Sequence, residues 1–255
     1  HTAFGKDSGT LLSTGTGNAL FGEGAGADLT TGEHNVAVGY HALYQGTTET
    51  DDNVAIGYNA MRGGWTTAAV NDCVVIGSGA GAGALVADAS GLVAIGAAAG
   101  AAVTDPQDTG EVSTFVGYQA GTANTIGSAN TALGYQALLT NVAGGRNTAI
   151  GFQSLKVSTS GSAADHFNTA VGYKSGIALT SGTHNTFIGG RAALGTQLVD
   201  KTVIIGAEAG EGVMTADADG TVSIGYKAGY SLTSGQGNVS IGYEALDLED
   251  DGDYN

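Results

Sequence analysis

The sequence is poor in the residues that cross-link or hinge a chain. Its 255 residues include one cysteine, Cys73, and one proline. A single cysteine excludes an intrachain disulfide and leaves the redox compartment of the protein open. A single proline excludes collagen-like and proline-rich sequences, which contain this residue at high frequency. Any rigidity must therefore come from packing and hydrogen bonds.

Charge is also scarce, and most of it has one sign. Only 13% of the residues are charged, and 24 acidic against 8 basic residues give a formal net charge of −16. Such a chain repels phosphate backbones and anionic lipid headgroups, so we expect no nucleic-acid partner and no binding to a membrane surface. No apolar run reaches the roughly 18 residues of a transmembrane helix, so we expect no membrane insertion in this segment.

Glycine, in contrast, is abundant and periodic. It accounts for 45 residues. NTALGYQAL, which begins at Asn130, returns as NTAIGFQSL 17 residues later. Alignment on the glycine of this phrase gives fourteen anchors with spacings of 17–21 residues: Gly5, Gly22, Gly39, Gly57, Gly77, Gly96, Gly117, Gly134, Gly151, Gly172, Gly189, Gly206, Gly225 and Gly242. We number positions relative to this anchor, so that −1 precedes it and +1 follows it.

Each position around the anchor has a restricted composition. Position −1 is Phe, Val, Ile or Leu in all fourteen repeats, and position −3 is Val or Thr in thirteen. Eight repeats have an aromatic residue at +1, and all have Ala or Ser at +3. Position −4 is Asn in eight repeats: Asn18, Asn35, Asn53, Asn130, Asn147, Asn168, Asn185 and Asn238. A short run of β-branched residues bounded by Gly and Asn is typical of a strand followed by a turn.

A 17-residue repeat is too short for a strand–helix unit, which needs about 30 residues. We therefore predict an all-β parallel β-solenoid over residues 1–246, with about 14 coils and like residues stacked in rows. The asparagines at −4 are expected to form amide ladders between coils. The acidic residues 247–255 are expected to form a cap or linker.

The residues at −1 and −2 predict association between copies. Side chains alternate faces along a strand, yet both positions are apolar. We interpret the large residues at −1 as the core, and we expect the mostly small residues at −2 to face outward. A strand that is apolar on both faces is covered on both, so a second copy is expected to cover the outer one.

The phrases NTAVGYKSG, NVAIGYNAM and NTALGYQAL resemble the head repeats of trimeric autotransporter adhesins and the repeats of bacteriophage tail fibres. The resemblance implies a left-handed β-roll within a homotrimer. It also implies a structural fibre segment on a virion tail fibre or a bacterial cell surface, which is an extracellular location. Adhesion to a surface glycan or protein receptor through edge loops is the accompanying expectation.

Insertions between the repeats supply the candidate binding residues. Tyr44 and Trp65 are candidates for stacking on a sugar ring, because flat aromatic faces suit the apolar faces of sugars. The alternative is a Trp that packs on its own loop. Asp217 and Asp219 in the stretch DADG are candidate Ca²⁺ ligands, although this stretch lacks the distal Glu of a calcium loop. The alternative is a solvated acidic loop, and we expect no other cofactor.

We predict no catalytic residues and no enzymatic activity. The five histidines and Cys73 show no metal-ligand spacing, and the glycines follow the coil period instead of opening a phosphate-binding helix. One alternative is a tailspike-like enzyme that degrades polysaccharides with paired carboxylates. A second is an ice-binding solenoid. It would need an outward row of Thr, whereas we expect the Thr row at −3 to share the face of the core row at −1.

Overall fold

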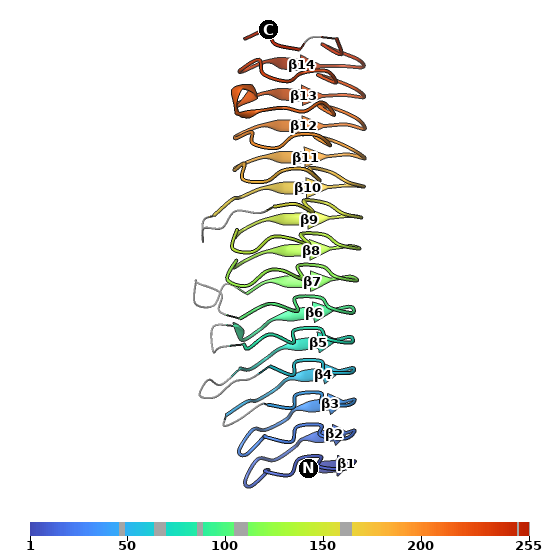
Figure 1. The fold of residues 1–255 in the computed structure, drawn as a ribbon, viewed down its shortest axis with the longest axis vertical. Coiled ribbons are helices and arrows are strands. Elements are labelled where there is room, and N and C mark those ends of the chain that lie inside the picture. Colours follow the sequence, from blue (N-terminus) through green and yellow to red (C-terminus); the bar gives the residue numbers. More distant parts are fainter. Residues whose placement is uncertain are drawn as a thin grey trace. The chain divides into compact units, whose positions relative to one another are not determined.

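A computed structural model describes residues 1–45, 49–63, 70–85, 89–104, 112–158, 165–248 and 250–254. The chain forms two compact units, His1–Ala129 and Asn130–Asn255. Figure 1 shows the strands of each unit in sequence order, one beside the next. The first unit contains β1 (Thr2–Phe4), β2 (Ala19–Phe21), β3 (Val36–Val38), β4 (Val54–Ile56), β5 (Val74–Ile76), β6 (Val93–Ile95) and β7 (Thr114–Val116).

The second unit contains β8 (Thr131–Leu133), β9 (Thr148–Ile150), β10 (Thr169–Val171), β11 (Thr186–Ile188), β12 (Val203–Ile205), β13 (Val222–Ile224) and β14 (Val239–Ile241). A 3-10 helix, η2 (Ala216–Ala218), is its one helical element among the described residues. Every strand ends directly before an anchor glycine. The prediction of an all-β chain with one strand for each repeat is confirmed.

Within each unit the strands pair in parallel and in register. Thr148, Ala149 and Ile150 of β9, for example, pair with Thr169, Ala170 and Val171 of β10. Equal positions of successive repeats therefore lie beside one another, at about 4.8 Å for strands in a sheet. Parallel pairing between consecutive strands requires one coil of chain for each strand, and this arrangement is the predicted parallel β-solenoid.

The anchor glycine allows the chain to leave the strand and begin the next side of the coil. Gly189 has a φ of +138°, a conformation that L side chains rarely adopt. A Cβ atom at this position would also overlap the carbonyl oxygen of Gly206, the anchor of the next coil. Both the backbone angle and the close approach of the next coil therefore require glycine.

The predicted assignment of the inner and outer strand faces is wrong. The central residue of the strand, at −2, is buried in β2 to β14, whereas the residues at −3 and −1 are half-buried or exposed. Ala149 and Phe187 are both fully buried, but Leu133 and Ile188 are 47% and 38% exposed. The coil is too narrow to enclose two large rows, so it encloses the mostly small row at −2. The large aliphatic row faces outward together with the Thr/Val row at −3.

In the coil interior, the sizes of the side chains at positions −2 and +4 are inversely related. Five coils have a large residue at −2. In four of them +4 is glycine, as in the pairs Leu20 and Gly26, Val75 and Gly81, Phe115 and Gly121, and Ile204 and Gly210. In the fifth, Phe187 occurs with Ala193, and the glycine beside its ring is Gly176, at +4 of the preceding coil. Where −2 is alanine, +4 is often a buried Leu or Met, as in the pairs Ala37 and Leu43, Ala55 and Met61, Ala132 and Leu138, and Ala149 and Leu155. A Cβ atom on Gly210 would lie 2.8 Å from the Ile204 side chain. The interior is therefore close-packed, with one large residue for each site.

The C-terminal acidic segment continues the coil pattern past residue 246. The Thr233 N–H donates to the Asp250 carbonyl at 2.8 Å, and the Tyr254 N–H donates to the Gln236 carbonyl at 2.9 Å. These bonds place the described part of residues 247–255 on the preceding coil. The role of residues 247–255 as a cap or linker stays a prediction.

Candidate functional site

Two outward rows of each unit form one uncharged surface, which we call the strand face. It consists of the residues at −3 and −1 of the strands, such as Thr148 and Ile150. No charged residue occupies either row in the whole sequence, although the net charge is −16. Apolar residues of this face are strongly exposed at several coils, including Leu133 and Val239 at 47% and 53%. The strand face is thus a regular, uncharged and largely apolar surface of each unit.

A third outward row lies at +1. The aromatic rings of this row stack on one another along the coils, and we call them the aromatic ladder. The ring centres of Tyr40 and Tyr58 lie 5.4 Å apart, with an angle of 10° between the ring planes. Phe152 stacks between Tyr135 and Tyr173, at 5.0 and 5.3 Å. Stacked rings cover each other's faces and leave mainly their edges exposed. A ring at an interruption or at an end of the ladder can present a face to a ligand.

The asparagines at −4 form amide ladders inside the coils. The Asn35 side chain donates to Asn18 Oδ1 at 3.1 Å, and Asn35 Oδ1 accepts from the backbone and side-chain N–H groups of Asn53. Asn168 and Asn185 repeat this geometry in the second unit. Further backbone carbonyls accept from the amides of Asn130 and Asn238. These buried amides bond to the chain itself, so they stabilise the stacking of the coils and offer no reactive group.

Of the two aromatic candidates for sugar binding, only Tyr44 belongs to the described residues. Tyr44 is half-buried, and its ring centre lies 4.2 Å from that of His41, which stacks on Tyr40 at 3.8 Å. Tyr44 is thus the outer member of an aromatic cluster on the first unit. Trp65 lies outside the described residues, so joint stacking of Tyr44 and Trp65 on a sugar stays a prediction.

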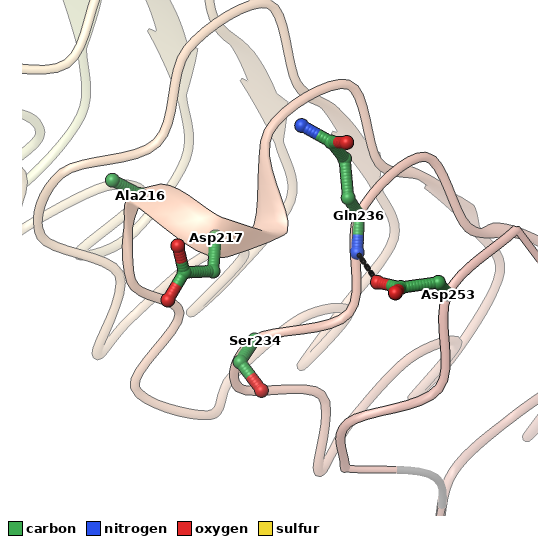
Figure 2. Close-up of a pocket in the computed structure, with 5 residues that line it drawn as sticks. All are labelled: Ala216, Asp217, Ser234, Gln236 and Asp253. Carbon is green, nitrogen blue, oxygen red and sulfur yellow. Dashed lines mark hydrogen bonds between the residues drawn. The ribbon is translucent and has the colours of Figure 1, made fainter.

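The structure places the two candidate Ca²⁺ ligands in different surroundings. Asp219 Oδ1 accepts the Asp200 N–H at 2.7 Å, which is a bond between neighbouring coils. Asp217 lies on η2 and lines an open pocket of about 300 Å³ with Ala216, Ser234, Gln236 and Asp253 (Figure 2). No group of three or more His, Cys, Asp or Glu residues in the described part is arranged to hold a metal ion. Calcium binding by this pair stays a prediction.

Asp219 belongs to a row of side-chain acceptors at −6 that the sequence analysis missed. The Glu33 N–H donates to Asp51 Oδ1 at 2.7 Å, and the Asp51 N–H donates to Asn71 Oδ1 at 2.8 Å. In the second unit the Thr183 N–H donates to Asp200 Oδ1. Asp, Asn and Ser share this position because each has a side-chain oxygen that accepts a backbone N–H of the neighbouring coil. Their constant distance from the anchor glycine was the sequence signal that could have revealed this row. Several acidic residues therefore have a structural role, which weakens the case for a carboxylate pair in catalysis.

One buried side chain in each unit has a clearly shifted pKa, His166 in the second unit and Cys73 in the first. Burial lowers the pKa of the His166 side chain, although the nearby Asp165 and Asp200 carboxylates raise it. Burial also raises the pKa of the Cys73 thiol to about 11. Cys73 occupies the asparagine position, where its N–H donates to Asn53 Oδ1 at 3.0 Å. Both shifts follow from enclosure within the coils, which favours the neutral forms.

We expect the Cys73 thiol to be inert in the folded protein. A pKa of about 11 in place of about 9 lowers the thiolate fraction at pH 8 by about 100-fold, and enclosure lowers access further. Labelling with a disulfide reagent at pH 8 should therefore be at least 100-fold slower than in the denatured chain. Because the pKa is raised, the thiol's contribution to stability is complete below pH 9 and is lost as the pH rises toward 11. Equal labelling rates in the two states would contradict this geometry.

No helix among the described residues is both long and apolar enough to cross a membrane. The geometry is that of a repetitive scaffold with one uncharged outward face and one aromatic ladder. No protein-family model matches the chain, and no curated protein sequence or solved structure matches it either.

Proposed function

We propose that the chain is a structural, non-enzymatic segment of an extracellular or virion fibre. In this proposal its copies associate through the strand face, and its edge loops bind a surface receptor. The single observation that carries the proposal is the outward orientation of the large aliphatic row, such as Leu133 and Ile188. The resemblance of the repeats to adhesin heads and tail fibres supports the same role.

The strand face of one unit has the size of a substantial apolar patch. Three strand residues and a coil spacing of about 4.8 Å give roughly 50 Å² for each coil, or about 340 Å² for seven coils. The largest apolar patch of a monomer is usually about 300–600 Å² and is often functional, whereas a stable interface buries about 800 Å² on each partner. In this proposal the aromatic ladder therefore adds to the contact area of the strand face.

Charge directs association to this face. A chain with a net charge of −16 repels its own copies through its acidic loops. The strand face carries no charge, so contact there avoids this repulsion and removes Val, Ile and Leu side chains from water. Each repeat stabilises mainly its neighbours, so such a fibre can be lengthened coil by coil. Three copies around a common axis is the arrangement implied by the resemblance.

Charged substitutions on the strand face test the proposal. We expect the variant with both Leu133→Asp and Ile188→Asp to remain folded, because both side chains are partly exposed. Its association should be lost, because the substitutions place like charges opposite each other in a desolvated interface. Sedimentation equilibrium should give three chain masses for the wild type and one for the variant. Val213→Asp is the matched control, since Val213 is 53% exposed and lies outside the strand face.

A monomeric wild type would overturn the self-association proposal. Unchanged association in the double variant would equally exclude the strand face as the interface. Circular dichroism on both variants separates loss of association from loss of folding.

Ice binding is a second candidate. The sequence analysis disfavoured it because the Thr row at −3 was expected to share the core face with the row at −1, and the structure has both rows on the outward face. Four threonines lie outward and in register on β8 to β11: Thr131, Thr148, Thr169 and Thr186. In the part of the chain that the structure describes, their hydroxyls bond to no protein group. They are therefore free to order water at intervals of about 4.8 Å. A monomeric wild type with thermal hysteresis would favour this candidate over the fibre interface.

A further inference from the structure

The aromatic ladder of the second unit is interrupted at two successive coils. The residues at +1 are Phe152 and Tyr173 before the interruption, then Gly190 and Ala207, and then Tyr226 and Tyr243. Tyr173 stacks on Phe152, and Tyr226 stacks on Tyr243 at 5.3 Å, each on the side away from the interruption. A Cβ atom on Gly190 would meet no atom within 4 Å. We call these two coils the Gly190 gap.

The Gly190 gap leaves two positions of the ladder without rings between its bordering tyrosines. Tyr173 and Tyr226 are three coils apart, or about 14 Å at the usual strand spacing. Neither of these two tyrosines has a ring partner toward the gap among the described residues. Tyr173 is 51% exposed, against 40% for Tyr226 and 43% for Tyr135. Tyr173 is therefore the ring that offers a face to a ligand here, and such faces bind the apolar faces of sugars.

The row beside the gap, at +2, contains three basic residues and one acidic residue, Glu208. Lys174, Arg191 and Lys227 are three of the eight basic residues of the chain, and they occupy three of four successive coils. Lys174 Nζ lies 5.2 Å from the centre of the Tyr173 ring, and Lys227 Nζ lies 5.4 Å from that of Tyr226. Two ammonium groups therefore lie against the two rings that border the gap.

The three cations differ in how far they are already neutralised. Arg191 pairs with both Glu208 and Glu211, and Lys227 Nζ lies 3.8 Å from a Glu208 oxygen. Lys174 has no carboxylate within ion-pair distance among the described residues. In a chain with a net charge of −16, this leaves one uncompensated ammonium beside an exposed ring face.

We propose that the Gly190 gap binds a pyranose sugar that carries a carboxylate. The apolar face of the sugar stacks on Tyr173, and the carboxylate pairs with Lys174. Uronic acids and sialic acids share this chemistry. The site deepens the receptor-binding part of the proposed function and rests on it for its biological setting, but sugar binding does not depend on self-association. A ring with a carboxylate satisfies the aromatic face and the ammonium together, which neither a neutral sugar nor an inorganic anion does.

The first unit contains a natural comparison site. Ser78 and Ala97 interrupt the ladder there, between Tyr58 and Tyr118. The accompanying residues at +2 are all uncharged, namely Asn59, Gly79, Ala98 and Gln119. This gap has tyrosines at its borders but no ammonium group, so it should not prefer an acidic sugar.

Calorimetric titration of the whole chain with trigalacturonic acid, sialyllactose and neutral galactotriose tests the site. We expect at least one acidic probe to bind at least tenfold more tightly than galactotriose, and the stronger of the two identifies the source of the carboxylate. Lys174→Gln should weaken binding of the acidic probe about tenfold without changing the response to galactotriose. Tyr173→Ala should abolish binding, whereas Tyr58→Ala in the first unit should leave it unchanged.

Equal affinity for acidic and neutral probes, or no binding of any probe at millimolar concentration, would overturn the proposal. An unchanged affinity in Lys174→Gln would do the same, and circular dichroism on each variant excludes unfolding as the cause. Loss of self-association in Tyr173→Ala, without sugar binding by the wild type, would instead assign the gap to the interface between copies. If the wild type proved monomeric but bound the sugar, the proposed sugar site would stand and only the proposed interface between copies would be refuted.

Discussion

Gly189→Ala is expected to destabilise the second unit by about 2–6 kcal/mol, because two costs add at this position. An alanine at a φ of +138° is strained by about 1–3 kcal/mol. Its methyl group would also overlap the carbonyl oxygen of Gly206, and overpacking of this kind costs about 1–3 kcal/mol more. The melting temperature should fall by roughly 10 °C, at about 2–4 °C for each kcal/mol in a chain of this size.

The adjacent Gly190 provides the matched control. Its backbone lies outside the strained range of φ, and a Cβ atom there meets nothing within 4 Å. Gly190→Ala should therefore change the melting temperature by no more than about 2 °C, since surface substitutions usually stay within 0.5 kcal/mol. Equal melting temperatures for the two variants would show that the anchor glycine is not required by the close approach of the next coil.

The period of the sequence was sufficient to predict the strands and their parallel pairing. Every repeat supplies its own strand and its own anchor, so the signal is repeated fourteen times and an error in one coil has little influence. The pairing needs no long-range information, because each strand pairs with the strand one repeat away. Resemblance to fibre repeats was not needed for this part of the prediction.

The period was insufficient to tell the inside of the coil from the outside. Both Ala149 and Ile150 are apolar, and size suggested that Ile150 lies in the core. The correct signal was covariation within the coil, in which Ala132 occurs with Leu138 and Phe115 with Gly121. Two positions that exchange volume must share one space. Position −1 shows no such exchange, since it remains large in every repeat.

The candidate site was predicted only in part. A sequence shows which side chains carry oxygen atoms, but it does not show which hydrogen bonds those atoms already accept. Asp219 is a predicted candidate Ca²⁺ ligand, and only the structure shows that its Oδ1 also accepts a backbone N–H of the neighbouring coil. The Gly190 gap was not predicted, because it depends on what is missing from a row. Lys174 and Tyr173 are adjacent in the sequence, and only the structure shows the ammonium lying against the ring.

Phe187→Ala is expected to cost about 3–5 kcal/mol, as is usual when a buried aromatic side chain is removed. Phe187 is fully buried, and its ring fills the space beside Gly176 of the preceding coil. A Cβ atom on Gly176 would lie 2.7 Å from the Phe187 ring and 3.0 Å from Leu155. Gly176→Leu alone should therefore overpack the interior and cost about 1–3 kcal/mol.

The double variant, Phe187→Ala with Gly176→Leu, should be more stable than Phe187→Ala alone by about 1 kcal/mol, because a coupling of about 3 kcal/mol between residues in contact exceeds the cost of about 2 kcal/mol of Gly176→Leu alone. The new Leu refills the vacated space, and Gly176 has a φ of +58°, close to the +46° at which Leu155 fills the same position one coil earlier. Hydrogen exchange of the backbone amides of β10 and β11 measures the local opening energy of all four proteins. If the two substitutions proved additive, position −2 of one coil and position +4 of the preceding coil would not share one space. A recovery of stability would establish this exchange as the rule that directs the large aliphatic row outward, toward the surface proposed for association.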